Sequence, residues 1–308
     1  MRTIAVDWSG RKQGAARHIW AAEVAAGELV SLSNGRTGPQ LAGWLVDQAP
    51  GGEELAVGLD FAFSLPAWYL RLLGVARAPE LWDAAAADGE SWLSACQAPF
   101  WGRKGAGKPI GQEHFRRTEL ETPPVGPGAI RPKSVFQIGG AGAVGTGSIR
   151  GMGLLARLRR EGFAVWPFDE TGWPRVVEIY PRLLTGPVTK SLQPARAGYL
   201  ARRGWPADAA LRERAASTED AFDAALSALA MDEHREDLAT PPPVPEIAAL
   251  EGWIWCPRVW CPRTTPELLK CGGKSLPYRV SQNGEPDSAY RLSGPPRHPG
   301  AGGRRLGA

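Results

Sequence analysis

The alternation of apolar and polar residues predicts three strands in succession at the start of the chain. Residues 3–8 are β-branched and apolar, contain Asp7 and lead into a Ser-Gly turn, which is typical of a buried strand. Residues 18–24 and 28–32 have the same character, and the short turn between them predicts a hairpin. The chain is therefore expected to open with three antiparallel strands.

A helical pattern then precedes a fourth apolar segment. Residues 38–48 carry apolar side chains at helical spacing and end before a Pro-Gly-Gly sequence. Residues 55–63 are almost continuously apolar and are interrupted by Asp60. A helical crossover between two apolar strands implies parallel pairing with both faces of the sheet covered. We therefore expect the fourth strand to lie parallel to the first.

The remaining chain predicts an insertion followed by further α/β elements. Residues 66–133 are irregular, with short helices expected at 66–74 and 79–95 and then a loop rich in Gly and Pro. Beyond this insertion the pattern predicts strands and helices in the following order: a strand at 134–138, a helix at 148–161, strands at 163–168 and 175–180, and a helix at 218–232 capped by Ser217 or Thr218.

Charge divides the chain into two unlike parts. The formal net charge is +4, but residues 256–308 carry nine basic and three acidic groups, so residues 1–255 have a net charge of −2. The basic part is rich in Pro and Gly and lacks a convincing periodic apolar pattern, which is typical of disorder. The prediction is a folded domain over 1–255 and a disordered basic tail over 256–308.

Composition also limits where the protein works. No apolar run approaches the ~18 residues that a membrane span requires, and the N-terminus is too short and too acidic for a signal peptide. Four cysteines are too few for a disulfide framework, so the reducing cytoplasm is the expected location. In the tail, the C-x4-C-x9-C spacing lacks the paired short hooks of a zinc site.

Acidic residues interrupt the apolar segments at several points. Asp7, Asp60 and Glu178 each lie within a predicted strand, where an unpaired carboxylate costs several kcal/mol unless a cation or another partner compensates it. Asp220 and Asp223 are three residues apart and share one face of the predicted last helix. Each acid alone could be a cap or an ion-pair partner. Together, such oxygen ligands suit Mg²⁺ or Mn²⁺, and paired ions of this kind cleave phosphodiesters.

The order of these acidic segments resembles the ribonuclease-H-like superfamily. More closely, it resembles the domain of unknown function 429 family, which is described as predicted ribonuclease-H-like nucleases. The stretches that carry the resemblance are Ala5–Trp8, Gly58–Pro66, Glu178–Pro181 and Glu219–Ala224. The resemblance covers most of residues 3–255 and leaves out the tail.

This resemblance implies an α/β fold, in which a mixed sheet of three antiparallel strands and then parallel strands is flanked by helices. It implies that Asp7, Asp60 and Asp223 bind Mg²⁺ or Mn²⁺ and that Asp220 and Glu178 complete the catalytic group. Glu178 has the alternative of fixing a strand end or a basic neighbour. The implied activity is metal-dependent hydrolysis of DNA or RNA, with nucleic acid as the partner.

Two glycine-rich motifs compete with this interpretation. Gly140–Gly145 matches the dinucleotide fingerprint G-x-G-x-x-G, and Asp169 stands about where a ribose-binding acid is expected. Gly102–Pro109 resembles a phosphate-binding loop, but Pro109 replaces the Ser or Thr that binds magnesium. The alternatives to a nuclease are therefore a nucleotide-cofactor enzyme that uses Gly140–Gly145 and a non-catalytic binding protein with the same fold.

Overall fold

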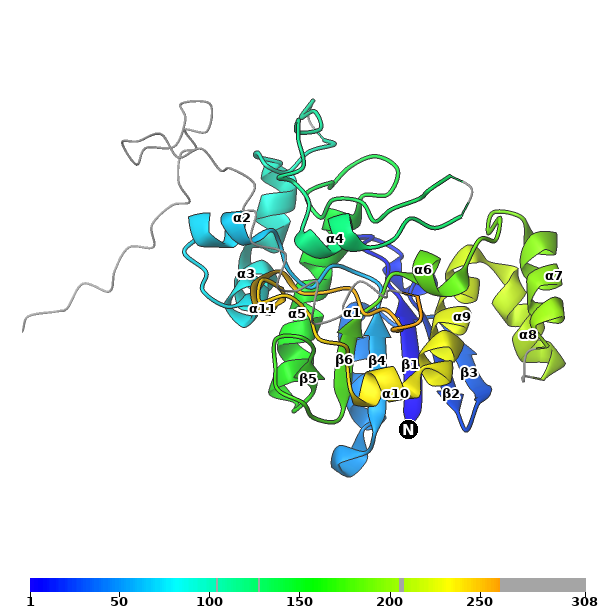
Figure 1. Ribbon diagram of the computed structural model, residues 1–308. Helices are drawn as coiled ribbons and strands as arrows, with labels where there is room; N and C mark the ends of the chain where they lie inside the picture. Colours follow the sequence, from blue (N-terminus) through cyan, green and yellow to red (C-terminus); the bar gives the residue numbers. More distant parts are fainter. Residues whose placement is uncertain (104, 127, 205–207, 261–308) are drawn as a thin grey trace, which may run out of the picture. The chain divides into compact units, whose positions relative to one another are not determined.

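The computed structural model describes residues 1–103, 105–126, 128–204 and 208–260. Six strands form one mixed sheet in the order β3-β2-β1-β4-β6-β5 (Figure 1). The first three strands pair antiparallel and the other pairings are parallel, so the predicted α/β class and mixed sheet are confirmed. The strands are β1 (Arg2–Asp7), β2 (Trp20–Ala25), β3 (Glu28–Ser33), β4 (Leu55–Leu59), β5 (Ala164–Val165) and β6 (Arg175–Glu178).

Helices flank this sheet, and several of them are short. The longer helices are α1 (Gly38–Asp47), α3 (Ala78–Ala95), α5 (Val144–Arg160), α7 (Gln193–Arg203), α8 (Ala209–Ser217) and α9 (Glu219–Glu233). The shorter ones are α2 (Ala67–Leu72), α4 (Arg117–Glu121), α6 (Pro181–Thr185), α10 (Arg235–Ala239) and α11 (Ala248–Glu251), with 3₁₀ turns at Ala15–Arg17 and Pro50–Gly52.

Successive residues of β1 and β4 point alternately into two apolar cores, one on each face of the sheet. Ile4 and Val6 belong to the core that contains residues of α1, α3 and α5, whereas Ala5 belongs to the core that contains residues of α9. The buried hydroxyl of Thr3 donates a 3.0 Å hydrogen bond to Ala228 O of α9. The same parity holds in β4, so every second residue of these two strands faces α9.

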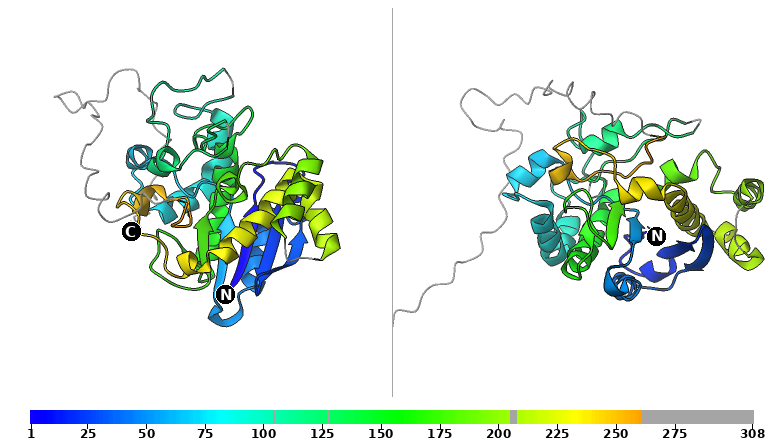
Figure 2. Two further views of the ribbon diagram at one scale, coloured as in Figure 1. Left: turned by 45° about the vertical axis from the view of Figure 1, so that its right-hand side comes forward. Right: turned by 60° about the horizontal axis from the view of Figure 1, so that its bottom comes forward.

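The helix α9 packs closely on β1 and β2 (Figure 2). Its residues from Ala221 to Asp232 are buried, and many of them are alanine. On the sheet, a Cβ atom at Gly58 would lie 2.6 Å from the sulfur of Met231, so only glycine accommodates the helix at this point of β4. These small residues place the start of α9 near the ends of β1 and β4.

Several predicted boundaries differ from the structure; the strand predicted over 175–180, for example, ends at Glu178. Residues 134–138 form a turn with one bridge between Trp101 and Gln137 rather than a strand, and α5 begins at Val144 instead of 148. Only Ala164–Val165 of the predicted 163–168 strand belongs to the sheet, because the chain then turns and the Phe168 amide donates to Val165 O.

The packed chain extends beyond the predicted boundary at residue 255. Arg258 forms a 2.7 Å ion pair with Asp237, and the Trp260 ring lies 4.9 Å from the His234 ring. Residues 261–308, which include most of the tail predicted to be disordered, lie outside the described residues. No helix in the described chain has the length and apolar character needed to cross a membrane.

Candidate functional site

Asp7 and Asp60 lie side by side where β1 and β4 end. The parallel register pairs Val6 with Leu59, and the Asp60 amide donates a 3.1 Å hydrogen bond to Val6 O. Asp7 is the last residue of β1, and Asp60 directly follows β4. Alternation from Ala5 and Gly58 directs both carboxyl groups to the face that α9 covers. The predicted proximity of these two acids is therefore present in the structure.

The third carboxylate comes from the first part of α9. The Thr218 hydroxyl caps this helix by accepting a 3.0 Å hydrogen bond from the Ala221 amide. Asp223 follows in the next turn and is 9% exposed. Its charge raises the pKa values of both Asp7 and Asp60, which shows that the helix brings it to the strand ends.

Burial and mutual repulsion oppose the ionised form of these acids. The pKa of Asp7 is raised well above 3.8 by burial and then by the charges of Asp60, Asp223 and Asp220. The pKa of Asp60 is raised to about 7, chiefly by burial, with a contribution from Asp223 and an opposing hydrogen bond with the Asp7 carboxyl. Burial also raises the pKa of Asp223. Because the raised pKa values favour the protonated forms, a cation would compete with protons for these carboxylates.

A lysine that the sequence analysis did not single out lies within this group. Lys190 is buried, and its ammonium forms an ion pair with Asp223 Oδ2. The other oxygen, Asp223 Oδ1, is buried without a hydrogen-bond partner among the described residues. Arg182 also lowers the pKa of Asp223 electrostatically. Positively charged side chains therefore lie next to the carboxylates at this end of the sheet.

Two further side chains border the carboxylates. Burial raises the pKa of Tyr180 to about 12, with smaller contributions from the charges of Asp60 and Asp223. His18 Nδ1 lies 3.1 Å from Asp220 Oδ2, and both of these side chains are more than a third exposed. Asp220 therefore contacts a histidine at the edge of the group, from which its charge still acts on Asp7.

Glu178 lies on the other face of the sheet. The register of β4 and β6 pairs Glu178 with Leu59 rather than with Asp60, so alternation turns it away from α9. Its Oε2 accepts 2.9 Å hydrogen bonds from Arg116 Nη1 and from the Phe63 amide, and Arg116 Nη2 binds its Oε1. The structure does not bring Glu178 into contact with the three aspartates, and instead shows it fixing a strand end and a basic neighbour.

The donor set fits a hard divalent cation by its chemistry. Asp7, Asp60 and Asp223 supply carboxylate oxygens, the ligands that Mg²⁺ and Mn²⁺ prefer, and Asp223 Oδ1 lacks another partner among the described residues. Within the described ranges, no three or more His, Cys, Asp or Glu side chains are already arranged around a metal position. Asp7 and Asp60 share a hydrogen bond and Asp223 binds Lys190, so cation binding requires these contacts to rearrange.

The glycine-rich turn before α5 uses its amides internally. Val144 N donates to Gly142 O, Gly145 N donates to Gln137 O and Thr146 N donates to Ala143 O. No strand leads into this turn within the described chain, and Asp169 forms a 2.8 Å ion pair with Arg159. Among the described residues, the turn therefore lacks the preceding strand of a dinucleotide fingerprint, and three of the amides at its helix end already have partners. In the second motif, the described residues around Gly102 form a loop, and Lys104 lies outside the described residues.

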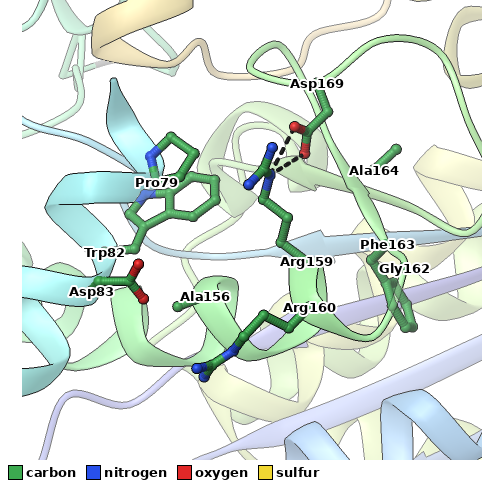
Figure 3. A pocket seen from close by; sticks show the side chains of 10 residues that line it. All are labelled: Pro79, Trp82, Asp83, Ala156, Arg159, Arg160, Gly162, Phe163, Ala164 and Asp169. Carbon is green, nitrogen blue, oxygen red and sulfur yellow. Dashed lines mark hydrogen bonds and ion pairs between the residues drawn. The ribbon is translucent and has the colours of Figure 1, made fainter. Parts of the chain in front are cut away.

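A separate pocket lies beside the ends of α3 and α5 (Figure 3). Its volume is about 450 Å³, and its walls include Trp82, Arg160 and the ion pair of Arg159 with Asp169. None of the clustered aspartates lines it. It therefore contributes nothing to the candidate site at the ends of β1 and β4.

Comparisons with protein-family models, with curated proteins and with solved structures find no significant match for this chain. The chemistry of the site is therefore inferred from its own residues and their geometry.

Proposed function

We propose that this protein is a metal-dependent phosphodiesterase that hydrolyses nucleic acid. The observation that carries the proposal is the convergence of Asp7, Asp60 and Asp223 from two adjacent parallel strands and one helix, with raised pKa values. Strongly perturbed acids cluster at functional sites, and the strand ends of an open α/β sheet are where such sites commonly lie. The resemblance to ribonuclease-H-like nucleases supports the same assignment.

In this proposal Asp7 and Asp60 hold Mg²⁺ or Mn²⁺ at the strand ends, and Asp223 contributes from α9. The bound cation would supply Lewis-acid activation of water and neutralise charge that develops on the phosphate. Arg182 and Lys190 bring positive charge to the same place, which favours a phosphodiester over a neutral substrate. Asp220 contacts His18 and acts on Asp7 through its charge.

The proposal is tested by cleavage of labelled single- and double-stranded DNA and RNA with Mg²⁺, Mn²⁺ or EDTA. Replacement of an outer-shell residue commonly costs ~10–100-fold in activity, so we expect Asp7→Asn and Asp60→Asn to lose at least ~100-fold. Asp88→Asn, which alters an exposed aspartate on α3, serves as the matched control. Equal cleavage with EDTA, or full activity of the Asp7→Asn/Asp60→Asn double variant, would contradict the proposal.

A further inference from the structure

Lys190 is held inside the carboxylate group by the fold. It lies in the loop between α6 and α7, and its side chain is 8% exposed. Its ammonium binds Asp223 Oδ2. It also lowers the pKa values of Asp7 and Asp60, so its charge reaches all three aspartates.

A buried arginine fixes the backbone that carries this lysine. Arg196 is 4% exposed and donates to the carbonyl oxygen of Lys190. The same guanidinium donates to Ala216 O at 3.0 Å and to Ser217 O at 3.1 Å. These two carbonyls directly precede the Thr218 cap of α9, the helix that carries Asp223. One side chain therefore connects the lysine loop to the start of the helix, and the two partners of the ion pair are positioned together.

The charges at this position balance one divalent cation. Three ionised aspartates and one ammonium have a net charge of −2. The positive charge that Arg182 adds at Asp223 is offset by Asp220, whose charge acts on Asp7. Two divalent cations would leave excess positive charge in a partly buried place, where unbalanced charge is costly. The charge of Glu178 also raises the pKa of Asp60, but Glu178 forms an ion pair with Arg116 on the other face of the sheet.

We infer that Lys190 takes the place of a second divalent cation, so that the three aspartates bind one Mg²⁺ or Mn²⁺ ion per chain. This inference rests on the proposed cation site. An ammonium has three donors, so Lys190 can bind Asp223 and still offer hydrogen bonds to a phosphate oxygen. The lysine then supplies at one side of the substrate the positive charge that a second ion supplies in two-metal enzymes.

The inference is tested by counting bound Mn²⁺ on the full chain, by calorimetric titration and by the electron paramagnetic resonance signal of free Mn²⁺. The wild-type chain should bind one ion. Lys190→Met frees Asp223 and should bind two ions, whereas Lys190→Arg retains the positive charge and should bind one. Circular dichroism and thermal unfolding establish that each variant is folded.

Two bound ions in the wild-type chain, or a dipolar Mn²⁺–Mn²⁺ coupling in its resonance spectrum, would overturn the inference. These wild-type measurements decide the question even where Lys190→Met does not fold. One ion in both the wild type and a folded Lys190→Met variant would also overturn it, because the lysine would not occupy a second cation's place. Absence of any Mn²⁺ binding would instead contradict the proposed cation site itself.

Discussion

Replacing Asp60 by asparagine should stabilise the protein when no metal is present. In the folded chain, burial and the charge of Asp223 raise the pKa of Asp60 from 3.8 to about 7. Ionisation of Asp60 therefore destabilises the folded state but not the unfolded chain. An asparagine has no such charge, and its amide can donate a hydrogen bond to the Asp7 carboxylate.

The raised pKa determines both the size and the sign of this effect. At about pH 8 the difference between 3.8 and 7 corresponds to a ceiling of about 4 kcal/mol. Partial exposure of Asp60 reduces this value, so we expect a gain of about 1–3 kcal/mol. A raised acid pKa means that the folded state binds the proton more tightly. Stability due to this group is therefore present below about pH 4 and is lost as the pH rises to about 7.

The measurement is urea unfolding of the wild type, Asp60→Asn and the control Asp88→Asn in EDTA, at about pH 5 and about pH 8. The stability gain of Asp60→Asn should be larger at the higher pH, and the control should stay within about 0.5 kcal/mol of the wild type. Added Mn²⁺ should reverse the order, because ligand binding stabilises the wild type more. Equal or lower stability of Asp60→Asn than of the wild type at about pH 8, or a stability gain that is independent of pH, would contradict this expectation.

Two further changes test the surroundings of the site by urea unfolding. Arg116→Met should lower the free energy of unfolding by about 3–5 kcal/mol, because it leaves the buried carboxylates of Glu178 and Glu119 without their cationic partner. A loss below about 1 kcal/mol would contradict this role. Gly145→Ala should lower the free energy of unfolding by about 1–3 kcal/mol, since the new Cβ would lie 2.0 Å from Val135 O. The control is Gly107→Ala, whose Cβ would meet nothing within 4 Å. Equal stability of the two variants would contradict a tight contact at Gly145.

Local patterns of apolar and polar residues in the sequence predicted the parts of the fold that position the site. The opening hairpin, the helical crossover and the apolar fourth strand determine that β1 and β4 are parallel neighbours. Since Asp7 and Asp60 stand at equivalent ends of these strands, their proximity follows from the topology. The pair Asp220 and Asp223 at helical spacing likewise marked the helix that closes over them. These inferences required only periodicity and connection rules.

Other features depend on contacts that a sequence pattern does not contain. Glu178 interrupts an apolar strand just as Asp60 does, but a register that pairs it with Leu59 turns it to the opposite face. Its partner Arg116 is 62 residues away within an irregular insertion. Lys190 lies in a loop without periodicity, so no local signal marked it. The position of His18 could have been predicted from the sequence, because an antiparallel β2 must begin beside the end of β1.

The proposed function requires that Asp7, Asp60 and Asp223 hold a divalent cation. The most direct measurement is the anomalous diffraction of Mn²⁺ in crystals grown at about pH 8. We predict an anomalous peak about 2 Å from oxygen atoms of Asp7 and Asp60, beside Asp223, that is absent from crystals of the Asp7→Asn/Asp60→Asn double variant. Saturating Mn²⁺ with no peak at these residues would contradict it.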